Sequence, residues 1–213
     1  GADQNLGNNC GECPGYAEVY QVDESYSSAT QIGDRLLGKL NGDGFGFQTS
    51  ISSSGDIVAS SSFNDSGTEE PNSENWRTGL VRIYALNKQN DNYTQLGNDL
   101  HGETGNEMFG YDIELSSDGT RIAVAAPSAT TSVGVGSGYG AVYQYNIETN
   151  NWDLLGEKIL GQNEGDYAGS AIALSGDGKI IALGARRHDG EKGSNSGHVR
   201  VFKYNDEENS WSQ

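Results

Sequence analysis

The chain is poor in basic residues and has no long apolar run. Of its 213 residues, 30 are Asp or Glu and only 13 are Lys or Arg, which gives a formal net charge of −17 at pH 7. A surface this acidic repels phosphate backbones and anionic membranes, so we expect no nucleic-acid partner. No apolar run approaches the roughly 20 residues that a membrane-spanning helix needs, so no membrane span is expected. The composition favours an extracellular or cell-surface protein.

Cysteine is almost absent as well. Cys10 and Cys13 lie together in the segment NNCGECPG. A C-x-x-C pair can be a redox motif, half of a zinc site or a short disulfide, but no second pair completes a four-thiolate zinc site and no βαβ pattern surrounds this one. We expect a structural disulfide, either between these two residues or to a segment outside this sequence. Residues 1–14 are interpreted as an irregular leader, and no cofactor or metal is predicted.

Helical periodicity is also missing, and a two-residue alternation takes its place. The chain has 31 Gly and only 3 Pro, and no long segment repeats apolar residues at helical spacing, so helix content should be low. In residues 109–126, FGYDIELSSDGTRIAVAA, apolar and polar residues alternate from Tyr111 to Leu115, which predicts a half-buried strand. Asp118-Gly119 predicts a tight two-residue hairpin turn that leads into a returning strand.

This two-strand unit is repeated at a spacing of about 60 residues. It returns as FGFQTSISSSGDIVASSS at 45–62 and as AGSAIALSGDGKIIALGA at 168–185. A third element opens with Gly and carries an aromatic residue five positions later: GYAEVY (15–20), GLVRIY (79–84), GYGAVY (138–143) and GHVRVF (197–202). A fourth element follows at 29–33, 93–97, 152–156 and 211–213.

Each full unit therefore predicts four short antiparallel strands, the pattern of a β-propeller blade. We expect an all-β propeller of about three and a half blades, with a half blade at 15–33 and blades at 45–97, 109–156 and 168–213. A solenoid is less favoured because its repeats are usually shorter. The predicted core lies at equivalent repeat positions: Tyr20, Tyr84, Tyr143 and Phe202; Ile51, Leu115 and Leu174; Val58, Ile122 and Ile181.

These motifs resemble the FG-GAP repeats of integrin α-like β-propellers, and in particular secreted algal and bacterial variants. The resemblance covers about residues 15–213 and rests on Phe109-Gly110, on the S-x-D-G turns, on Ala125-Ala126-Pro127 and on the segment 196–202. It decays at Ser61-Ser62-Phe63, which stands in place of the GAP tripeptide. The resemblance implies a propeller that takes part in adhesion.

One departure concerns calcium. FG-GAP repeats often carry a D-x-D-x-D-G-x-x-D loop between the first two strands, but the connections here are short turns with too few oxygens to enclose Ca²⁺. The linker segments 41–44 (NGDG) and 163–166 (NEGD) could hold a cation, although turn and blade-junction roles are the preferred interpretation. Two sequons, at Asn64 and Asn92, predict N-glycosylation in predicted loops.

The predicted strands leave one blade incomplete, because residues 15–33 supply only its third and fourth strands. We expect the missing pair to come from sequence beyond Gln213 or from another copy of the protein by strand addition. The predicted partners are therefore a protein or glycan, or further copies of the chain that self-assemble into a fibre or surface appendage.

Signatures of catalysis are weak. No G-x-S-x-G elbow, H-E-x-x-H motif or phosphate-binding loop occurs, and the three histidines, His101, His188 and His198, share no motif. His188 in Arg-Arg-His-Asp is a possible catalytic residue, with a solvated loop as the default interpretation. We therefore expect a non-enzymatic extracellular adhesion module with no catalytic residue; the alternative is a secreted propeller-type hydrolase or lyase with its site over the central channel.

Overall fold

The computed structural model describes residues 14–39, 42–65 and 77–213, and within these ranges the chain is entirely β and irregular structure. No helix in these ranges is long and apolar enough to cross a membrane. The predicted disulfide residues, Cys10 and Cys13, lie outside the described residues.

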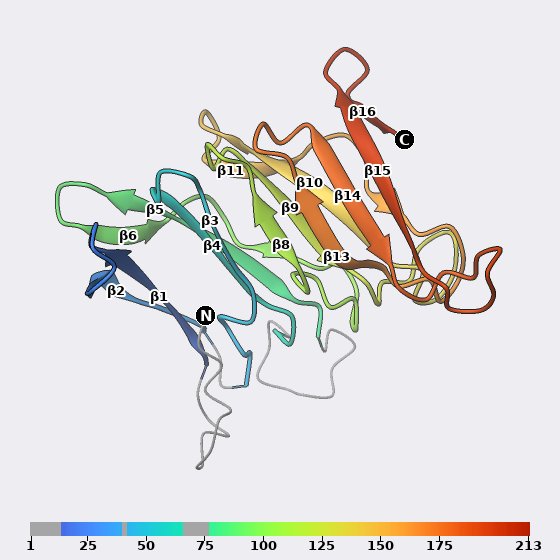
Figure 1. Cartoon of the computed structure of the whole chain (residues 1–213), viewed down its shortest axis with the longest axis horizontal. Helices are drawn as coiled ribbons and strands as arrows, with labels where there is room; N and C mark the ends of the chain where they lie inside the picture. The colour runs from blue at the N-terminus through green and yellow to red at the C-terminus, as the bar shows by residue number, and fades with distance from the viewer. Residues whose placement is uncertain (1–13, 40–41, 66–76) are drawn as a thin grey trace.

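The strands form four sheets, which Figure 1 shows side by side from blue to red. The opening sheet contains β1 (Tyr16–Val22) and β2 (Ala29–Leu37). The first blade contains β3 (Thr49–Ile51), β4 (Ile57–Ser62), β5 (Leu80–Asn87), β6 (Asn92–Gln95) and β7 (Leu100–His101). The second blade contains β8 (Ile113–Leu115), β9 (Arg121–Ala126), β10 (Tyr139–Asn146), β11 (Asn151–Leu154) and β12 (Ile159–Leu160). The third blade contains β13 (Ala168–Leu174), β14 (Ile180–Ala185), β15 (His198–Asn205) and β16 (Ser210–Ser212).

Each blade is an antiparallel meander in chain order, and the short strands β7 and β12 pair with β5 and β10 as continuations of the outer strand. The opening sheet has only two strands, whose order corresponds to the third and fourth strands of a blade. The protein is therefore a β-propeller segment of about three and a half blades, as the sequence predicts.

The hairpin turns differ from the prediction. The Ser116 amide donates to the Arg121 carbonyl at 2.9 Å, so this pair closes a loop of four residues, 117–120, and not of two. Gly119 has a positive φ of 71°, but Asp118 does not, because its carboxylate accepts hydrogen bonds from the Ser116 hydroxyl at 2.7 Å and the Thr120 amide at 2.9 Å. These side-chain contacts stabilise a wider loop.

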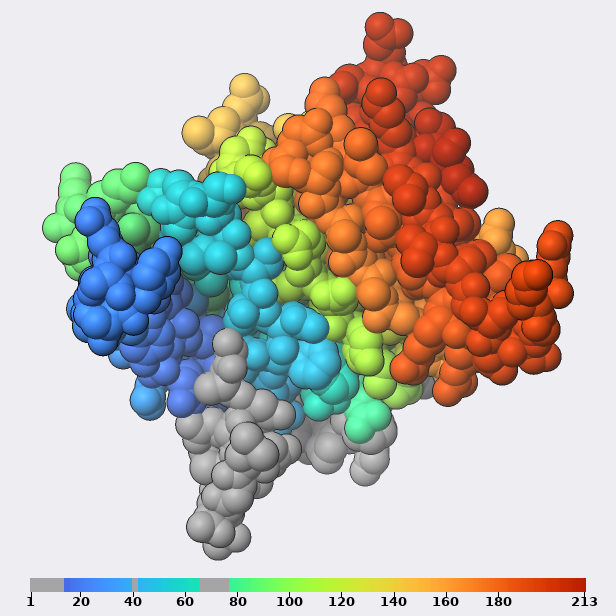
Figure 2. Space-filling view, in the orientation of Figure 1, coloured from blue at the N-terminus to red at the C-terminus, as the bar shows by residue number. Residues whose placement is uncertain are grey.

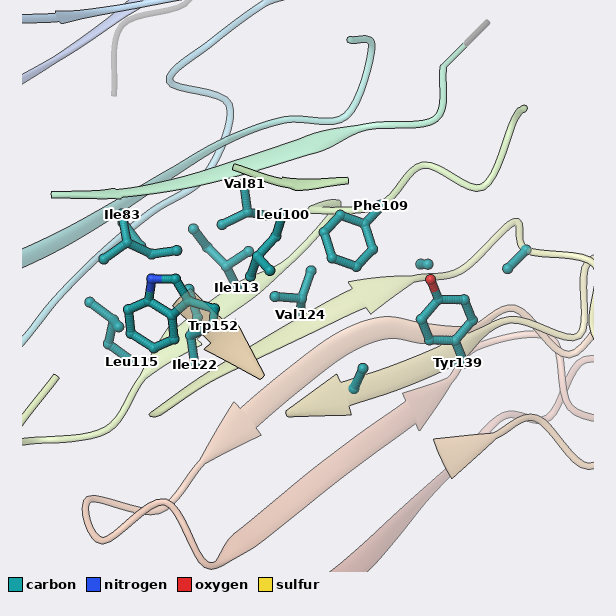
Figure 3. Packing of buried hydrophobic residues seen from close by; sticks show 14 residues of the cluster. Val81, Ile83, Leu100, Phe109, Ile113, Leu115, Ile122, Val124, Tyr139 and Trp152 are labelled. Atoms are coloured by element: carbon teal, nitrogen blue, oxygen red, sulfur yellow. The ribbon is translucent and has the colours of Figure 1, made fainter. Parts of the chain in front are cut away.

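The core is divided among the junctions between neighbouring sheets. At the junction of the first and second blades, Val81 and Ile83 of β5 pack against Ile113, Leu115 and other residues of the second blade, all of them buried, and Figure 3 shows their side chains pointing toward one another. Burial of one such side chain stabilises the fold by about 1.5–3 kcal/mol. We call the side of a sheet that faces the next sheet in chain order its forward face, and the other side its backward face.

The repeated glycine before each third strand has a structural reason at these junctions. Gly79 has a φ of +88°, and a Cβ placed there would lie 2.0 Å from the carbonyl oxygen of Phe109 in the next blade. A Cβ at Gly15 would lie 2.3 Å from the carbonyl oxygen of Phe45, and a Cβ at Gly138 would lie 2.3 Å from that of Ala168. The glycine and the F-G motif of the next repeat are therefore two sides of one backbone contact.

Two predicted core residues are exposed. Tyr20 is 49% and Ile51 is 54% exposed, whereas Leu115, at the repeat position of Ile51, is 5% exposed. The prediction is wrong for these two because a blade buries its backward face only against a complete preceding sheet. Tyr143 and Leu174 are half-buried, and the other predicted core residues are buried.

A buried ion pair holds the opening sheet against the first blade. Both side chains are nearly inaccessible, and Arg82 contacts Asp99 through Nε–Oδ1 at 2.6 Å and Nη2–Oδ2 at 2.8 Å. Arg82 Nη1 also donates to the Leu37 carbonyl of β2 at 3.3 Å, and Lys39 Nζ lies 2.7 Å from Asp99. Burial opposes ionisation of Asp99, but Arg82 and Lys39 outweigh it and lower the pKa of Asp99 to about 2.

Candidate functional site

The first strands of the three blades, β3, β8 and β13, lie next to one another on the side that faces the central channel of a propeller. Figure 2 shows this face, where the cyan, lime and orange bands of these strands follow one another. Hydrogen bonds connect the strands: the Leu115 amide donates to the Ser50 hydroxyl at 2.9 Å, and the Ile172 amide donates to Asp112 Oδ2 at 2.8 Å. This arrangement holds the channel side in register.

Two carboxylates stand next to each other on this side. Asp112 and Glu114 are two residues apart at the start of the second blade, so their side chains leave the same face of the strand. Asp112 is anchored, because one oxygen accepts the Ile172 amide and the other accepts the Ile113 amide at 3.0 Å. Glu114 is exposed to solvent.

Both carboxylates have a raised pKa. Burial raises the pKa of Asp112, although its two backbone hydrogen bonds oppose the shift. Glu114 is open to solvent on one side, but the protein around it partly desolvates its carboxylate and raises its pKa, and the negative charge of Asp112 adds to this shift. A carboxylate that binds a proton more tightly than usual, and that remains open to solvent, is suited to accept a proton from water.

Three aromatic rings gather at the linker end of the channel side. The ring centroids of Phe47 and Phe63 are 4.3 Å apart, and Tyr111 lies 5.8 Å from Phe47 and 6.0 Å from Phe63. Phe47 is 37% exposed, and Tyr111 directly precedes Asp112 in the chain. The aromatic rings therefore lie between the first and second blades, whereas Asp112, the next residue after Tyr111, contacts Ile172 of the third blade.

His188, the one histidine considered for catalysis, lies elsewhere, in the loop that follows β14. Its Nδ1 is 3.1 Å from Asp166 Oδ2, and its ring stacks on His198 with centroids 3.8 Å apart. The loop between β14 and β15 is mostly exposed, as the default interpretation expects, but the side chain of His188 itself is largely covered. Burial favours the neutral form of Asp166, but the hydrogen bonds with His188 and with the Asn163 amide outweigh it and lower the pKa of Asp166.

The repeat gives this histidine pair a structural role. Asp166 accepts the amides of Gln162 at 3.1 Å and Asn163 at 2.8 Å, and Glu107 accepts backbone amides at the same place in the previous repeat. Tyr139 donates to Glu107 at 3.0 Å, where His198 occupies the equivalent repeat position. Asp166 and Glu107 each hold the linker of their own repeat by accepting its backbone amides. We interpret His188 as a residue that anchors the loop after β14.

The linker segments proposed as cation sites contain such turn contacts. Among the described residues, no group of three or more His, Cys, Asp or Glu side chains is arranged to hold a metal ion. Asp166 accepts hydrogen bonds from the amides of Gln162 and Asn163 and contacts His188. The Gly165 amide donates to the Val135 carbonyl at 3.0 Å, and Asp43 is buried. Residue 41 lies outside the described part.

The two sequon asparagines are not freely exposed. Asn64 Oδ1 is buried without a hydrogen-bond partner among the described residues. The side chain of Asn92 donates to Asp34 at 2.8 Å and accepts the Asp34 amide at 3.0 Å, which links β6 to β2. Glycosylation of Asn64 and Asn92 stays a prediction.

The channel-side residues are not among the site residues predicted from the sequence. Asp112 and Glu114 stand where the other blades have Gln48 and Ser50 or Ala171 and Ala173, so the charge is specific to the second blade. Comparing the polar residues of the first strands between repeats could have found this difference. The aromatic cluster joins residues from two blades, so only the fold reveals it.

Comparisons with known proteins show the fold. No family model matches the sequence, and no curated protein matches it. A candidate 6-phosphogluconolactonase from Bacteroides fragilis is similar in structure, with a TM-score of 0.56 and 11% identity, over 91% of this chain and 46% of that protein. The periplasmic gluconolactonase PpgL of Pseudomonas aeruginosa has a TM-score of 0.50 and 16% identity, over 88% of this chain and 46% of that protein. A hypothetical selenium-binding protein of Sulfolobus tokodaii has a TM-score of 0.50 and 10% identity, over 83% of this chain and 44% of that protein.

The chain thus spans less than half the length of these similar structures. Two expectations from the sequence are corrected. The resemblance to FG-GAP integrin-type repeats is wrong, because no family model matches and the similar structures include lactonase propellers. The expected non-enzymatic adhesion module is wrong on the same comparison.

The reason for the wrong resemblance is physical. The F-G motif, the glycine before the third strand and the Asp-Gly turn serve the packing of one blade against the next, as Gly79 and Phe109 show. Any propeller with these junctions needs such residues, so the motifs describe the contact between blades and carry no information about a ligand.

Proposed function

We propose that this chain forms about half of a propeller hydrolase, and that the surface around Asp112 and Glu114 hydrolyses a small sugar-derived lactone. The observation that carries the proposal is the pair of channel-side carboxylates with raised pKa values, two residues apart on one strand. Two similar structures, from Bacteroides fragilis and Pseudomonas aeruginosa, are named for lactonases, which supports the choice of reaction.

In this reaction Glu114 is the general base. It takes a proton from a water molecule whose oxygen forms a bond to the lactone carbonyl carbon, and the tetrahedral intermediate then breaks the ring C–O bond. The proton passes from Glu114 to the departing ring oxygen, so the product is the open hydroxy acid. Partial desolvation raises the pKa of Glu114, and the charge of Asp112, which the amides of Ile113 and Ile172 hold in place, raises it further.

The aromatic cluster of Phe47, Phe63 and Tyr111 supplies the binding surface. A sugar ring has apolar C–H faces that pack on aromatic rings, while its hydroxyl groups donate hydrogen bonds to carboxylates. Tyr111 and Asp112 are neighbours in the chain, so both kinds of group lie near the start of the second blade, the rings toward the first blade and Asp112 toward the third. The extracellular location expected from the composition is part of the proposal.

The test is the release of acid from glucono-δ-lactone, followed at constant pH and corrected for spontaneous hydrolysis. We expect the chain to accelerate hydrolysis and Glu114→Gln to lower kcat at least about 100-fold, the usual contribution of a general base. Glu148→Gln, an exposed carboxylate on the β10–β11 hairpin, is the matched control and should have no effect. Phe47→Ala should raise KM more than it lowers kcat.

The pH dependence gives a second readout. The base form of Glu114 is required, so activity should rise with pH through a pKa above about 4.3, the ordinary value for Glu. Asp112→Asn removes the neighbouring charge and should shift this rise to lower pH. A wild-type rate equal to spontaneous hydrolysis, or equal rates for Glu114→Gln and Glu148→Gln, would overturn the proposal.

A further inference from the structure

The opening sheet has one strand edge that differs from its counterparts in the blades. β1 pairs with β2 from Tyr16↔Leu37 to Val22↔Ala29, and its opposite edge pairs with no strand among the described residues. In every blade the corresponding third strand pairs on both sides, and its contact with the second strand extends over six residue pairs. An unpaired edge of this kind is a template for strand addition.

The free edge borders a groove. A cavity of about 190 Å³ lies between β1 and the first blade, and it is lined by Ala17, Val19, Ile51, Val58 and neighbouring residues. Ile51 is 54% exposed here, although the same repeat position is buried at Leu115. The groove is therefore the backward face of the first blade without the strands that cover this face elsewhere.

The blades show which residues fit such a groove. The second strands β4 and β9 present Ala59 and Ala123 to the next blade, and both alanines are fully buried in the junctions. Their larger residues, such as Val58 and Val124, point to the opposite face. A strand that enters the groove beside β1 therefore needs small residues toward Ile51 and Val58 and larger residues on the other face.

A folded second copy cannot supply this strand. Its second strands β4, β9 and β14 are each already paired on both sides within their own blades. Donating one would dismantle a blade together with its packed junctions. The occupant must come from a polypeptide in which such a hairpin is free.

We propose that the free edge of β1 binds a β-hairpin with the first- and second-strand pattern of this repeat, supplied by a separate polypeptide segment. By the register of β9 on β10, in which Tyr143 pairs with Ile122 and Val142 with Ala123, Tyr20 pairs with a large apolar residue and Val19 with a small one. Main-chain hydrogen bonds supply the affinity, and the small residues supply the specificity.

The experiment uses a fluorescent synthetic peptide with the sequence of residues 109–126, added to the intact chain and followed by anisotropy. The control peptide carries phenylalanine in place of the alanine at the position of Ala123. We expect saturable binding of the first peptide and at least tenfold weaker binding of the second, because the alanine at this position is fully buried against the next blade in the complete junction.

Two chain variants locate the contact. Ile51→Arg introduces a charge into the groove and should weaken binding at least tenfold. Ile180→Arg, at a site of similar exposure on the third blade, should leave binding unchanged. Equal binding of the two peptides, equal effects of the two variants, or dimerisation of the chain in sedimentation with β1 protected and no peptide present would overturn the proposal.

Discussion

The junction between the first and second blades and the groove beside the opening sheet use the same repeat positions in opposite ways. Leu115 is buried at the junction, whereas Ile51 faces solvent at the groove. Arg82 forms a buried ion pair, whereas Glu18, at the same strand position in the opening sheet, pairs with the exposed Arg35. A blade of this protein is therefore stabilised by its neighbours more than by its own strands.

The other end of the stack supports the same conclusion. The third blade has all four strands, yet Val199 and Val201 on its forward face are 67% and 52% exposed. Val81 and Ile83, at the equivalent positions of the first blade, are fully buried against the second blade. A blade that has all four strands therefore still exposes the face that no neighbouring sheet covers.

The largest effect is expected at the buried ion pair. Arg82→Met leaves Asp99 buried with only Lys39 as its charged partner and should lower the free energy of unfolding by about 3–5 kcal/mol. Glu18→Gln is the matched control at the same repeat position and should have little effect, because its partner Arg35 is exposed to solvent. Urea denaturation of both variants measures the difference. Similar losses of unfolding free energy in the two variants would contradict this prediction.

The second largest effect is expected for substitutions at two equivalent apolar positions, Leu115 and Ile51. Leu115→Ala opens a cavity between two blades and should cost about 2–5 kcal/mol in unfolding free energy. Ile51→Ala removes a half-exposed side chain and should cost within about 0.5 kcal/mol. The Tm of each variant is measured by thermal unfolding followed by near-ultraviolet circular dichroism. Equal shifts in Tm would show that the groove is buried in solution.

The glycine contact gives a smaller and more local contrast. Gly79→Ala places a methyl group on the Phe109 backbone and should cost more than about 1 kcal/mol, since the positive φ adds to the overlap. Gly197→Ala has a similar φ of +70°, but the nearest atom lies 3.4 Å away. Its loss in chemical denaturation should come from backbone strain alone. A larger loss for Gly197→Ala would contradict the role of the glycine in the junction.

A pH-dependent effect is expected in acid. The folded pKa of Asp99, about 2, lies below its unfolded value of about 3.9, so its stabilisation is present above pH 3.9 and is lost as pH falls toward 2. Arg82→Met should raise this pKa and flatten the decline in stability between these values. Unfolding free energies measured from pH 5 to pH 2 test this, and an unchanged slope in the variant would contradict it.

Much of the fold could be predicted from the sequence because strand alternation and turn residues are local. Tyr111 to Leu115 shows the two-residue period of β8, and the Gly of each third strand marks a contact that every junction repeats. Whether a position is buried depends on the presence of the neighbouring sheet. For that reason Tyr20 and Ile51, which match the core pattern, are exposed.

The candidate site was harder to predict. Asp112 and Glu114 look like the solvent side of an amphipathic strand, and only the adjacency of β8 and β13 shows that Asp112 accepts the Ile172 amide. The aromatic cluster joins Phe47 and Phe63 to Tyr111 across a blade junction. Such contacts follow from the curvature of the stack, which sequence spacing does not encode.

Hydrogen exchange of β1 in the dilute chain measures whether one edge of the opening sheet is free. Residues 16–22 should exchange about half of their amides rapidly, because alternate amides of a strand point to each edge and one edge of β1 is free. The corresponding residues of β5, paired on both sides, should stay protected. Equal protection of β1 and β5 in the chain alone would contradict the account of the opening sheet as half a blade.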